Sequence, residues 1–368
     1  MMENKDTLAP LIITYRQIRD NSYVVGNDKY GMAEYVLNDE RRKACLSNPF
    51  NLSDDNPAFY FIKEGEDVVG RFQFLSSRMK MGDEILPCGT GSALEVVEKY
   101  RKLGVGADIM TYFTFNSGYD LFLTAGISSM AAPLYKALKY VTLEFPHLIC
   151  LYQPSRFFRY RGVNKMLYPL LYLCEIPFRL LRSIHIRKSN KLQRKFVITQ
   201  ENIVPEWVDD IVIRDGHKYM EVHDSKWIQW NLNNCFHADK TIKQAFYSIK
   251  YKEDNVGFFY ITERKQTKAG TPYNYINGYI AEWGTANETL LNESDIYNIA
   301  IGFFSKNVSV INISTSDVTT VKGVKRRGFI QVGVSNIALK CDKKKYPGIS
   351  DINQWRVRGG YADTMFFQ

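Results

Sequence analysis

The chain has 368 residues, of which 45% are hydrophobic and 14% aromatic, so its length and composition suit two packed domains. No stretch has 18 consecutive apolar residues and the N-terminal residues do not resemble a secretory signal, so we expect a cytoplasmic protein without a transmembrane segment. Residues 156–195 hold 11 Lys or Arg residues and one acid, so the net charge of +9 is a local feature and nucleic acid is not an expected partner.

The N-terminal part of the chain carries patterns for helices and one hairpin. Helical patterns are expected over residues 15–19 and 32–46, and a turn-rich loop over residues 51–57 follows them. Residues 59–63 and 68–75 predict two strands joined by a short polar turn.

A strand, a glycine-containing loop and a helix follow one another over residues 92–113. Residues 92–97 are apolar and rich in valine, which predicts a buried strand. The loop at residues 101–106 has the sequence RKLGVG and leads into an apolar helical period. Backbone N–H groups at such a helix N-terminus converge on an anion, and Gly104 and Gly106 lack the Cβ atoms that would hold a phosphate away.

A second strand and helix are expected directly afterwards. Residues 120–125 predict another buried strand, and residues 128–138 predict a helix with Pro133 in its first turn, where proline is tolerated. Residues 148–152 predict one further short strand.

These two strand–helix pairs resemble the acyl-CoA site of the GNAT N-acetyltransferase superfamily, whose loop is written Arg/Gln-x-x-Gly-x-Gly/Ala. Arg101, Gly104 and Gly106 fill that pattern, whereas Lys102 and Glu98 stand where glycine and proline are common. The same residues would also fit an ordinary strand-to-helix turn. The resemblance implies an α+β (α/β) fold with a mixed, mainly antiparallel sheet flanked by helices, and acetyl-CoA or another acyl-CoA as co-substrate.

The resemblance also implies which residues bind the acyl-CoA. The strand backbone would pair with pantetheine and donate to the thioester oxygen, and the loop would hold the pyrophosphate. Ser128 stands where many members have Asn, and its hydroxyl would bond the pantetheine arm. The expected cofactor-binding residues are Val96, Val97, Arg101, Lys102, Leu103, Gly104, Val105, Gly106, Ala107 and Ser128.

Two residues are expected to carry the chemistry, in which an amine attacks the thioester directly. Tyr135 belongs to a Leu-Tyr pair that resembles the pair in the family, whose tyrosine often acts as general acid on the thiolate leaving group. The alternative interpretation is that Tyr135 is a half-buried aromatic residue of a helix with no catalytic role. Glu95 is the first candidate for the general base, and its alternative is a solvated strand carboxylate. Glu98 and Glu282 are the other candidates for this base.

The basic segment at residues 156–195 has two interpretations. It is amphipathic, with basic ends and an apolar middle that contains Pro169 and Pro177. We expect a packed linker between two domains, because Glu175 and the two prolines would disturb a membrane-facing helix. The alternative is a surface that contacts anionic lipid or an acidic partner.

The second half repeats the first at an offset of 187 residues, since residues 66–72 compare with residues 253–259. The loop at 101–106 maps to residues 288–293, which contain two carboxylates and no glycine. We therefore expect two tandem GNAT-like domains with the acyl-CoA loop intact only in the N-terminal copy. The expected boundaries are 1–155 for the N-terminal domain, 156–195 for the linker and 196–368 for a degenerate C-terminal domain.

The resemblance implies an acyl-CoA-dependent N-acyltransferase, in first place an acetyltransferase, whose acceptor is a small amine, an amino sugar or a cell-envelope intermediate. One alternative is an aminoacyl transferase of the FemAB type that uses charged tRNA. The other is a non-enzymatic module that binds acyl-CoA.

The histidines and cysteines do not indicate a metal site or a disulfide framework. His217, His223 and His237 lie near Cys235, but their spacing fits no standard metal site, so no metal is expected. The six cysteines have no CxxC spacing and predict free thiols in a reducing compartment.

Overall fold

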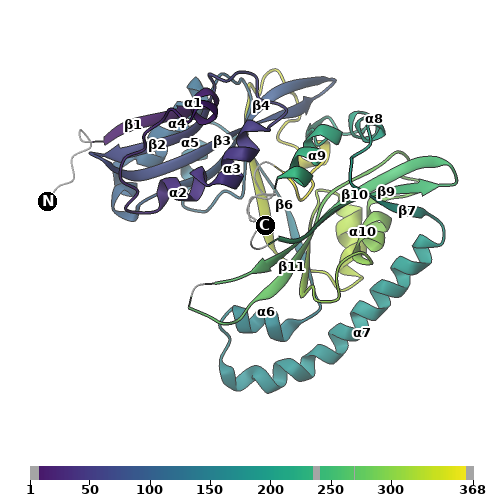
Figure 1. Cartoon of the computed structure of the whole chain (residues 1–368). Helices are drawn as coiled ribbons and strands as arrows, with labels where there is room; N and C mark the ends of the chain where they lie inside the picture. Colours follow the sequence, from purple (N-terminus) through teal and green to yellow (C-terminus); the bar gives the residue numbers. More distant parts are fainter. Residues whose placement is uncertain (1–7, 235–240, 269, 362–368) are drawn as a thin grey trace. The chain divides into compact units, whose positions relative to one another are not determined.

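The computed structural model describes residues 8–234, 241–268 and 270–361 (Figure 1). The chain divides into two compact units, and each is discontinuous in sequence. Unit 1 comprises Met1–Leu143, Lys218–Val222 and Asn336–Gln354. Unit 2 comprises Glu144–His217, His223–Ser335 and Trp355–Gln368.

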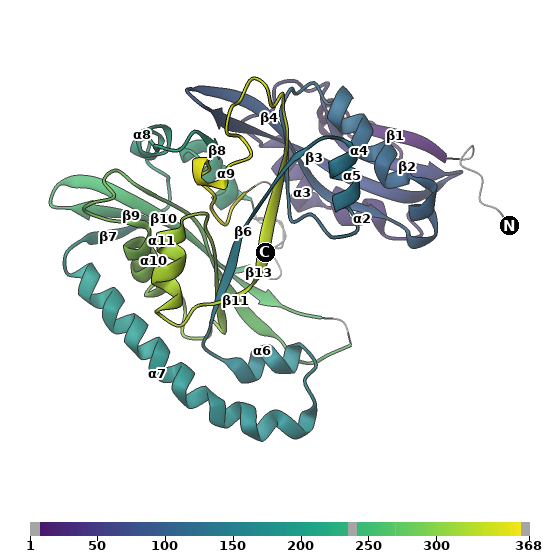
Figure 2. The ribbon, with the colours of Figure 1, turned by 180° about the vertical axis from the view of Figure 1, so that it is seen from behind.

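Unit 1 is a mixed sheet with helices on both faces (Figures 1 and 2). Its strands are β1 (Leu8–Thr14), β2 (Pro57–Glu64), β3 (Asp67–Met81), β4 (Glu84–Val96), β5 (Phe122–Ala125), β8 (Tyr219–Glu221) and the last residues of β13 (Ile330–Lys340). Its helices are α1 (Tyr15–Asp20), α2 (Met32–Leu37), α3 (Asp39–Leu46), α4 (Val105–Asn116) and α5 (Ala132–Ala137), with a 3₁₀ turn, η2 (Glu98–Leu103). The strand order is β1-β2-β3-β4-β5-β13 with β8 beside β3, and β4–β5 is the parallel pair.

The core of unit 1 is aromatic and lies beneath α4. Phe72 and Phe74 on β3 contact Phe113 of α4, with ring centroids 4.4 and 5.3 Å apart. A Cβ atom at Gly89 of β4 would lie 2.6 Å from the Phe74 ring, and one at Gly91 would overlap the Phe72 ring. These two glycines are therefore required for α4 to pack on the sheet.

Unit 2 has the same kind of sheet. Its strands are β6 (Val141–Leu151), β7 (Val197–Glu201), β9 (Thr241–Tyr251), β10 (Asp254–Gln266), β11 (Tyr275–Thr285) and β12 (Val310–Ser314). Its helices are α6 (Pro154–Tyr160), α7 (Tyr168–Gln193), α8 (Trp207–Ile213), α9 (Ser225–Asn233), α10 (Glu293–Ile301) and α11 (Val318–Lys325). The order is β6-β12-β11-β10-β9-β7, and β11–β12 is parallel. Both units are thus mixed, mainly antiparallel sheets flanked by helices, which confirms the expected fold class.

The two units also repeat one order of elements, strand–strand–helix–strand–helix. In unit 1 this order is β3, β4, α4, β5, α5, and in unit 2 it is β10, β11, α10, β12, α11. β3 begins at Asp67 and β10 at Asp254, 187 residues later; α4 begins at Val105 and α10 at Glu293, 188 residues later. The structural repeat therefore follows the offset found in the sequence.

The last strand of each repeat pairs with a strand of the other unit. β6 follows α5 in the chain, but its Leu148 pairs with Ile313 of β12 in unit 2. β13 follows α11, but its Leu339 pairs with Leu123 of β5 in unit 1. The structure thus divides the chain differently from the expected boundaries, and a fragment of residues 1–155 would lack the strand that covers β5.

The basic segment at residues 156–195 folds as part of unit 2. It forms most of α6, a short 3₁₀ turn and α7, a helix of 26 residues that packs on α10 and α6. Pro169 lies in the first turn of α7, and Pro177 lies inside the helix without ending it. The segment is therefore an integral helix layer of unit 2.

A cluster of charged side chains in unit 2 leads to a pH-dependent prediction. The Asp215 carboxylate accepts hydrogen bonds from His217 Nδ1 and Arg356 Nε, each at 2.7 Å, and lies 3.5 Å from Arg358. Burial raises the pKa of Asp215, but the His217 hydrogen bond and the two arginine charges outweigh burial and hold this pKa well below its usual range. The ionised form of Asp215 is therefore favoured over the protonated form more strongly in the folded chain than in the unfolded chain.

Asp215→Asn is expected to lower the free energy of unfolding by about 3 kcal/mol at pH 7, because it removes one negative partner from each of two buried arginines, Arg356 and Arg358. This advantage of the wild type should shrink as the pH falls from about 5 toward 2, since the unfolded carboxylate binds a proton first. Urea denaturation of both proteins at neutral and acidic pH measures the difference. An equal difference at both pH values would contradict the assignment.

Candidate functional site

A gap opens between β4 and β5 in unit 1. The two strands pair in parallel only at Gly89–Phe122 and Thr90–Leu123. β4 continues six residues beyond Thr90, to Val96, without a further registered pair to β5. This part of β4 therefore borders an opening in the sheet instead of a neighbouring strand on this side.

A β-bulge turns β4 at the start of this gap. Ser92 pairs with Gln73 and Glu95 pairs with Arg71, so two residues of β4 oppose one residue of β3. One of these two residues, Ala93, has a left-handed φ of 55°. The Arg71 side chain crosses the bulge, donating from Nε to the Ala93 carbonyl at 3.4 Å and pairing with the Glu95 carboxylate. A buried arginine thus holds the bulge in place.

The gap leads into a cavity of about 400 Å³. One wall comes from β4 and the N-terminal turn of α4, and the other comes from the segment that begins α5. The lining residues are Leu94, Glu95, Val96, Arg101, Gly104, Gly106, Ala107, Ser128, Met130, Ala131 and Leu134.

The first turn of α4 forms the polar end of this cavity. η2 ends at Gly104, which has a left-handed φ of 81°, and α4 begins at the next residue. The first N–H groups of a helix have no intrahelical acceptor, so they can donate to an anion. A Cβ atom at Gly106 would meet only Val96 Cγ2, at 3.9 Å, so the backbone here is open to the cavity. Arg101 donates from Nε to the Val96 carbonyl at 2.9 Å, which places its guanidinium at the cavity wall.

The structure brings most of the expected cofactor-binding residues to one cavity. Val96, Arg101, Gly104, Gly106, Ala107 and Ser128 all line it. Val97 does not, and its N–H donates to the Val69 carbonyl at 2.9 Å within the sheet. Val105 is buried in the core beneath α4, and Lys102 and Leu103 lie on η2 outside the lining set.

The apolar residues of the cavity lining were not among the site residues predicted from the sequence. Leu94 lies on the bulge, while Met130, Ala131 and Leu134 lie on or just before α5. Leu134 follows Ala131 by three residues and Met130 by four, and this helical spacing was the available signal that they share one face. Their position predicts apolar contact with the non-polar part of a ligand.

Glu95 lines the cavity but is held by Arg71. Its side chain is 47% exposed, whereas that of Arg71 is 9% exposed. Arg71 also lies over the Tyr35 ring, with the guanidinium carbon 4.0 Å from the centroid, so its orientation is fixed. A substrate amine would have to share the Glu95 carboxylate with this arginine.

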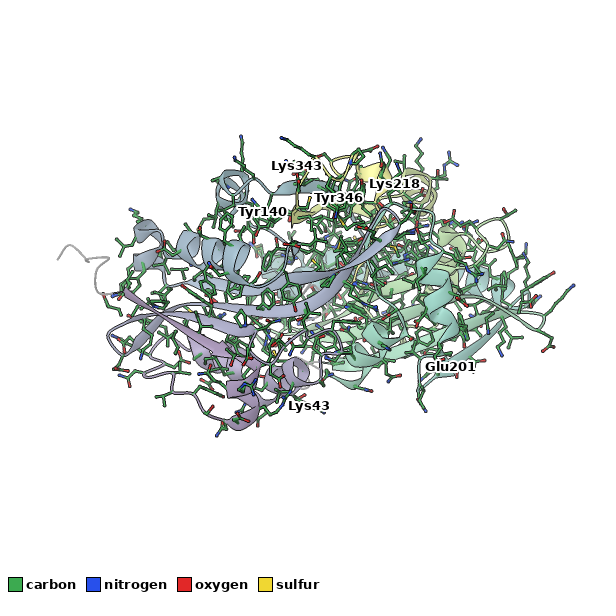
Figure 3. All side chains as sticks on the ribbon, turned by 90° about the horizontal axis from the view of Figure 1, so that it is seen from above. Lys43, Tyr140, Glu201, Lys218, Lys343 and Tyr346 are labelled. Carbon is green, nitrogen blue, oxygen red and sulfur yellow. The ribbon has the colours of Figure 1, made fainter. Side chains whose placement is uncertain are left out.

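Tyr135 lies on α5 beside the lining residue Leu134, but it points into the core. Its hydroxyl donates to Met110 Sδ at 3.9 Å, and Met110 lies one helical turn after Gly106. The ring contacts Tyr140, labelled in Figure 3, edge-on with centroids 5.0 Å apart. The hydroxyl therefore lies in the core of unit 1 and is not part of the cavity lining.

The equivalent gap in unit 2 is filled by the chain itself. β11 and β12 pair over only three residues, and β11 has a bulge at Ala281, because Tyr260 pairs with Glu282 and Ile261 with Ile280. Residues 355–361 are all buried, and the Gly360 N–H donates to the Ala281 carbonyl at 2.9 Å. This segment occupies the position in which a ligand would pair with β11.

In the part of the chain that the structure describes, the other residues considered as metal ligands or as the general base do not form a second site. His217 Nδ1 bonds Asp215, and His223 Nδ1 bonds Glu282 at 2.6 Å; Cys235 and His237 lie outside the described residues. Within the described ranges, no group of three His, Cys, Asp or Glu side chains is arranged to hold a metal ion. Glu282 is fully buried, and Glu98 lies on η2 outside the cavity lining.

The described cysteines are free thiols, and burial makes four of them poor nucleophiles. Desolvation raises the pKa of Cys341 to about 11. Desolvation raises the pKa of Cys45 and of Cys150 to about 12, and that of Cys88 well above its ordinary value. These thiols therefore stay protonated near neutral pH.

No protein-family model matches the sequence, and no curated protein matches it significantly. Solved structures do match. Saccharomyces cerevisiae N-myristoyltransferase with bound myristoyl-CoA has a TM-score of 0.59 at 10% identity, over 92% of this chain and 80% of that chain. A GCN5-related N-acetyltransferase from Anabaena variabilis has a TM-score of 0.53 at 10% identity, over 90% and 72% of the two chains.

A third structure covers both chains almost completely. A Pyrococcus horikoshii protein assigned as an acetyltransferase has a TM-score of 0.52 at 11% identity, over 99% of this chain and 97% of that chain. This chain shares the fold of these structures. At these identities the likeness shows the fold, and the activity has to be argued from the site.

Proposed function

We propose that the chain is an acyl-CoA-dependent N-acyltransferase that binds its thioester in unit 1. The observation that supports this most is the opening at Gly106, where the first turn of α4 faces the cavity beside the gap in the sheet. A diphosphate would accept hydrogen bonds from the first N–H groups of α4 and gain from the helix dipole. Arg101 adds a positive charge at the same end.

The pantetheine arm would then run along β4 beyond Thr90, where the strand has no registered partner on this side. Its amide groups match the hydrogen-bonding groups of a strand edge, and Ser128 on the opposite wall supplies a hydroxyl. Leu94, Met130 and Leu134 would contact the apolar parts of the arm. We propose acetyl-CoA as the donor in first place.

The proposed reaction is direct attack by a primary amine on the thioester carbonyl. The C–N bond forms, the C–S bond breaks, the amine loses one proton and the thiolate gains one. We propose Glu95 as the group that accepts the amine proton, directly or through water, and Tyr135 as the acid for the thiolate. The proposed acceptors are a small amine, an amino sugar or a cell-envelope intermediate.

A second candidate function is binding of acyl-CoA without transfer. It is favoured by the ion pair between Glu95 and Arg71 and by the position of the Tyr135 hydroxyl in the core. A tRNA-dependent aminoacyl transferase is less well supported, because its substrate would not need the open diphosphate position at Gly106.

A thermal-shift and mass-spectrometric screen tests the proposed function. Acetyl-CoA and longer acyl-CoAs should raise the melting temperature, whereas tRNA should not. Incubation with acetyl-CoA and amine mixtures should give an acylated amine and free CoA. Stabilisation without any acylated product would favour the binding module, and stabilisation by tRNA alone would contradict the proposal.

Tyr135→Phe tests the acid and separates the enzyme from the binding module. If the hydroxyl protonates the thiolate, kcat should fall by about 100-fold while the affinity for acetyl-CoA is unchanged. Tyr140→Phe is the matched control, because Tyr140 is equally buried and its hydroxyl bonds Thr114 instead. Equal activities of the two variants would remove Tyr135 from the mechanism.

A further inference from the structure

Helix α7 turns polar side chains toward unit 2. Its buried residues are Glu175, His185 and Ser189. Each of them has a partner: Ser155 donates to Glu175, His185 Nδ1 lies 2.6 Å from the Tyr152 hydroxyl, and Ser189 donates to a carbonyl of α10 at 2.9 Å. The packed face of this helix thus carries these three polar groups together with apolar side chains, since Leu181 and Leu192 pack against the main core of unit 2 and Phe178 packs against a smaller cluster.

The opposite face of α7 is apolar and open to solvent. The exposed side chains include Leu173 at 65%, Ile176 at 61% and Leu180 at 61%. Three- and four-residue spacings place five exposed aliphatic residues of α7 in one row, which we call the α7 stripe: Leu170, Leu173, Ile176, Leu180 and Ile184. A surface helix ordinarily turns polar residues to solvent, so an exposed apolar row of this length indicates a binding surface.

Figures 1 and 2 show α7 at the border of unit 2, with α10 and the sheet on one side of it. In both views the described part of unit 2 places no element on the other side of α7. The stripe is therefore open along its length.

The charges around the α7 stripe are positive. Arg187, Lys188 and Lys191 follow the stripe on α7, and all three are exposed. The one acid of residues 156–195, Glu175, is buried and pairs with Arg179 at 3.0 Å. An apolar row followed by exposed cations is typical of a helix that lies in the interface of an anionic bilayer.

A basic pocket lies beside the stripe, between α6 and α7. Its volume is about 490 Å³, and its lining residues are Tyr152, Gln153, Ser155, Arg156, Arg159, Tyr172, Glu175, Arg179, Arg182 and Lys306. The lining thus holds five cations and one carboxylate, with Arg179 paired to Glu175 and Arg182 donating to backbone carbonyls of residues 305, 306 and 308. Tyr172 and Arg179 lie three or four residues from Ile176 on α7, so the pocket opens at the flank of the stripe. Its charge suits a phosphate group.

We propose that α7 docks unit 2 on an anionic membrane surface, with the α7 stripe in the headgroup region and a lipid phosphate in the α6–α7 pocket. The helix would lie along the membrane: within the described ranges, no helix is both long and apolar enough to cross one. A second copy of the chain is a poorer occupant, because it would bring the same positive charges together. This inference does not depend on acyl transfer.

Co-sedimentation with lipid vesicles tests the proposal. The full-length protein should bind vesicles that contain phosphatidylglycerol and bind vesicles of phosphatidylcholine alone at least about tenfold more weakly, and added salt should release it. Leu173→Gln with Leu180→Gln should weaken binding on the order of tenfold, because two exposed leucines leave the interface. Arg156→Glu with Lys306→Glu should do the same through the pocket.

The matched control is Val332→Gln with Val334→Gln, which removes exposed apolar side chains of β13 elsewhere in unit 2. This control should bind vesicles as the wild type does, and all variants should keep the wild-type melting temperature. Equal binding to both kinds of vesicle would overturn the proposal. So would a concentration-dependent dimer that the two α7 stripe substitutions abolish while vesicle binding persists.

Discussion

Replacing Gly106 with leucine is expected to abolish acetyl-CoA binding while leaving the fold at least as stable. The Cβ atom would point into the cavity, where it meets only Val96, so the larger side chain fits but occupies the diphosphate position. Losing two hydrogen bonds from N–H groups to a charged phosphate costs about 3–6 kcal/mol, so Kd should rise more than about 100-fold. Leucine in place of a helical glycine should raise stability by about 0.5 kcal/mol.

Isothermal titration calorimetry with acetyl-CoA and thermal denaturation measure these two effects separately. Gly333→Leu is the matched control, because an added Cβ atom there meets no atom within 4 Å and the residue lies in unit 2. It should leave Kd unchanged. Retained binding by the Gly106→Leu protein would mean that acyl-CoA does not approach the first turn of α4.

Trp355→Ala is expected to cause the largest loss of stability among the substitutions considered. Trp355 is fully buried at the start of the segment that fills the gap in unit 2, and its carbonyl accepts a hydrogen bond from Ser316 Oγ at 2.8 Å. Truncating a buried tryptophan leaves a cavity and costs about 3–5 kcal/mol. Urea denaturation followed by circular dichroism measures this loss.

Trp207→Ala is the control for this substitution, because Trp207 is half-buried at the start of α8 in the same unit. It should lose less than half as much stability. Folded Trp355→Ala protein should also keep the wild-type Kd for acetyl-CoA, since every residue lining the proposed site belongs to unit 1. Equal losses from both tryptophans would show that residues 355–361 are not an essential part of unit 2.

The sequence predicted the elements that depend on local pattern. The valine-rich strand, the glycine loop and the helix after it lie where expected, because burial and the need for a left-handed residue at Gly104 act over a few residues. The 187-residue offset also predicted the repeated order of elements. Pro177 was expected to disturb a helix, but α7 continues through it. Pro177 has no N–H to donate to the Leu173 carbonyl, and Leu173 lies on the exposed side of α7, where water can hydrogen-bond this carbonyl.

Features that depend on distant parts of the chain could not be predicted. The bulge at Ala93 needs Arg71 from the neighbouring strand to hold a left-handed alanine. The pairing of β13 with β5 joins residues that lie more than 200 positions apart, and local periodicity does not identify a strand's partner. For the same reason, the sequence did not indicate that residues 355–361 fill the gap beside Ala281.

A crystal structure of the full chain with acetyl-CoA tests the central claim most directly. We expect the diphosphate within hydrogen-bonding distance of the N–H groups at the start of α4, and the pantetheine arm paired with β4 beyond Thr90. Acetyl-CoA bound elsewhere, with the Gly106 backbone facing an empty cavity, would contradict the proposed site and the mechanism built on it.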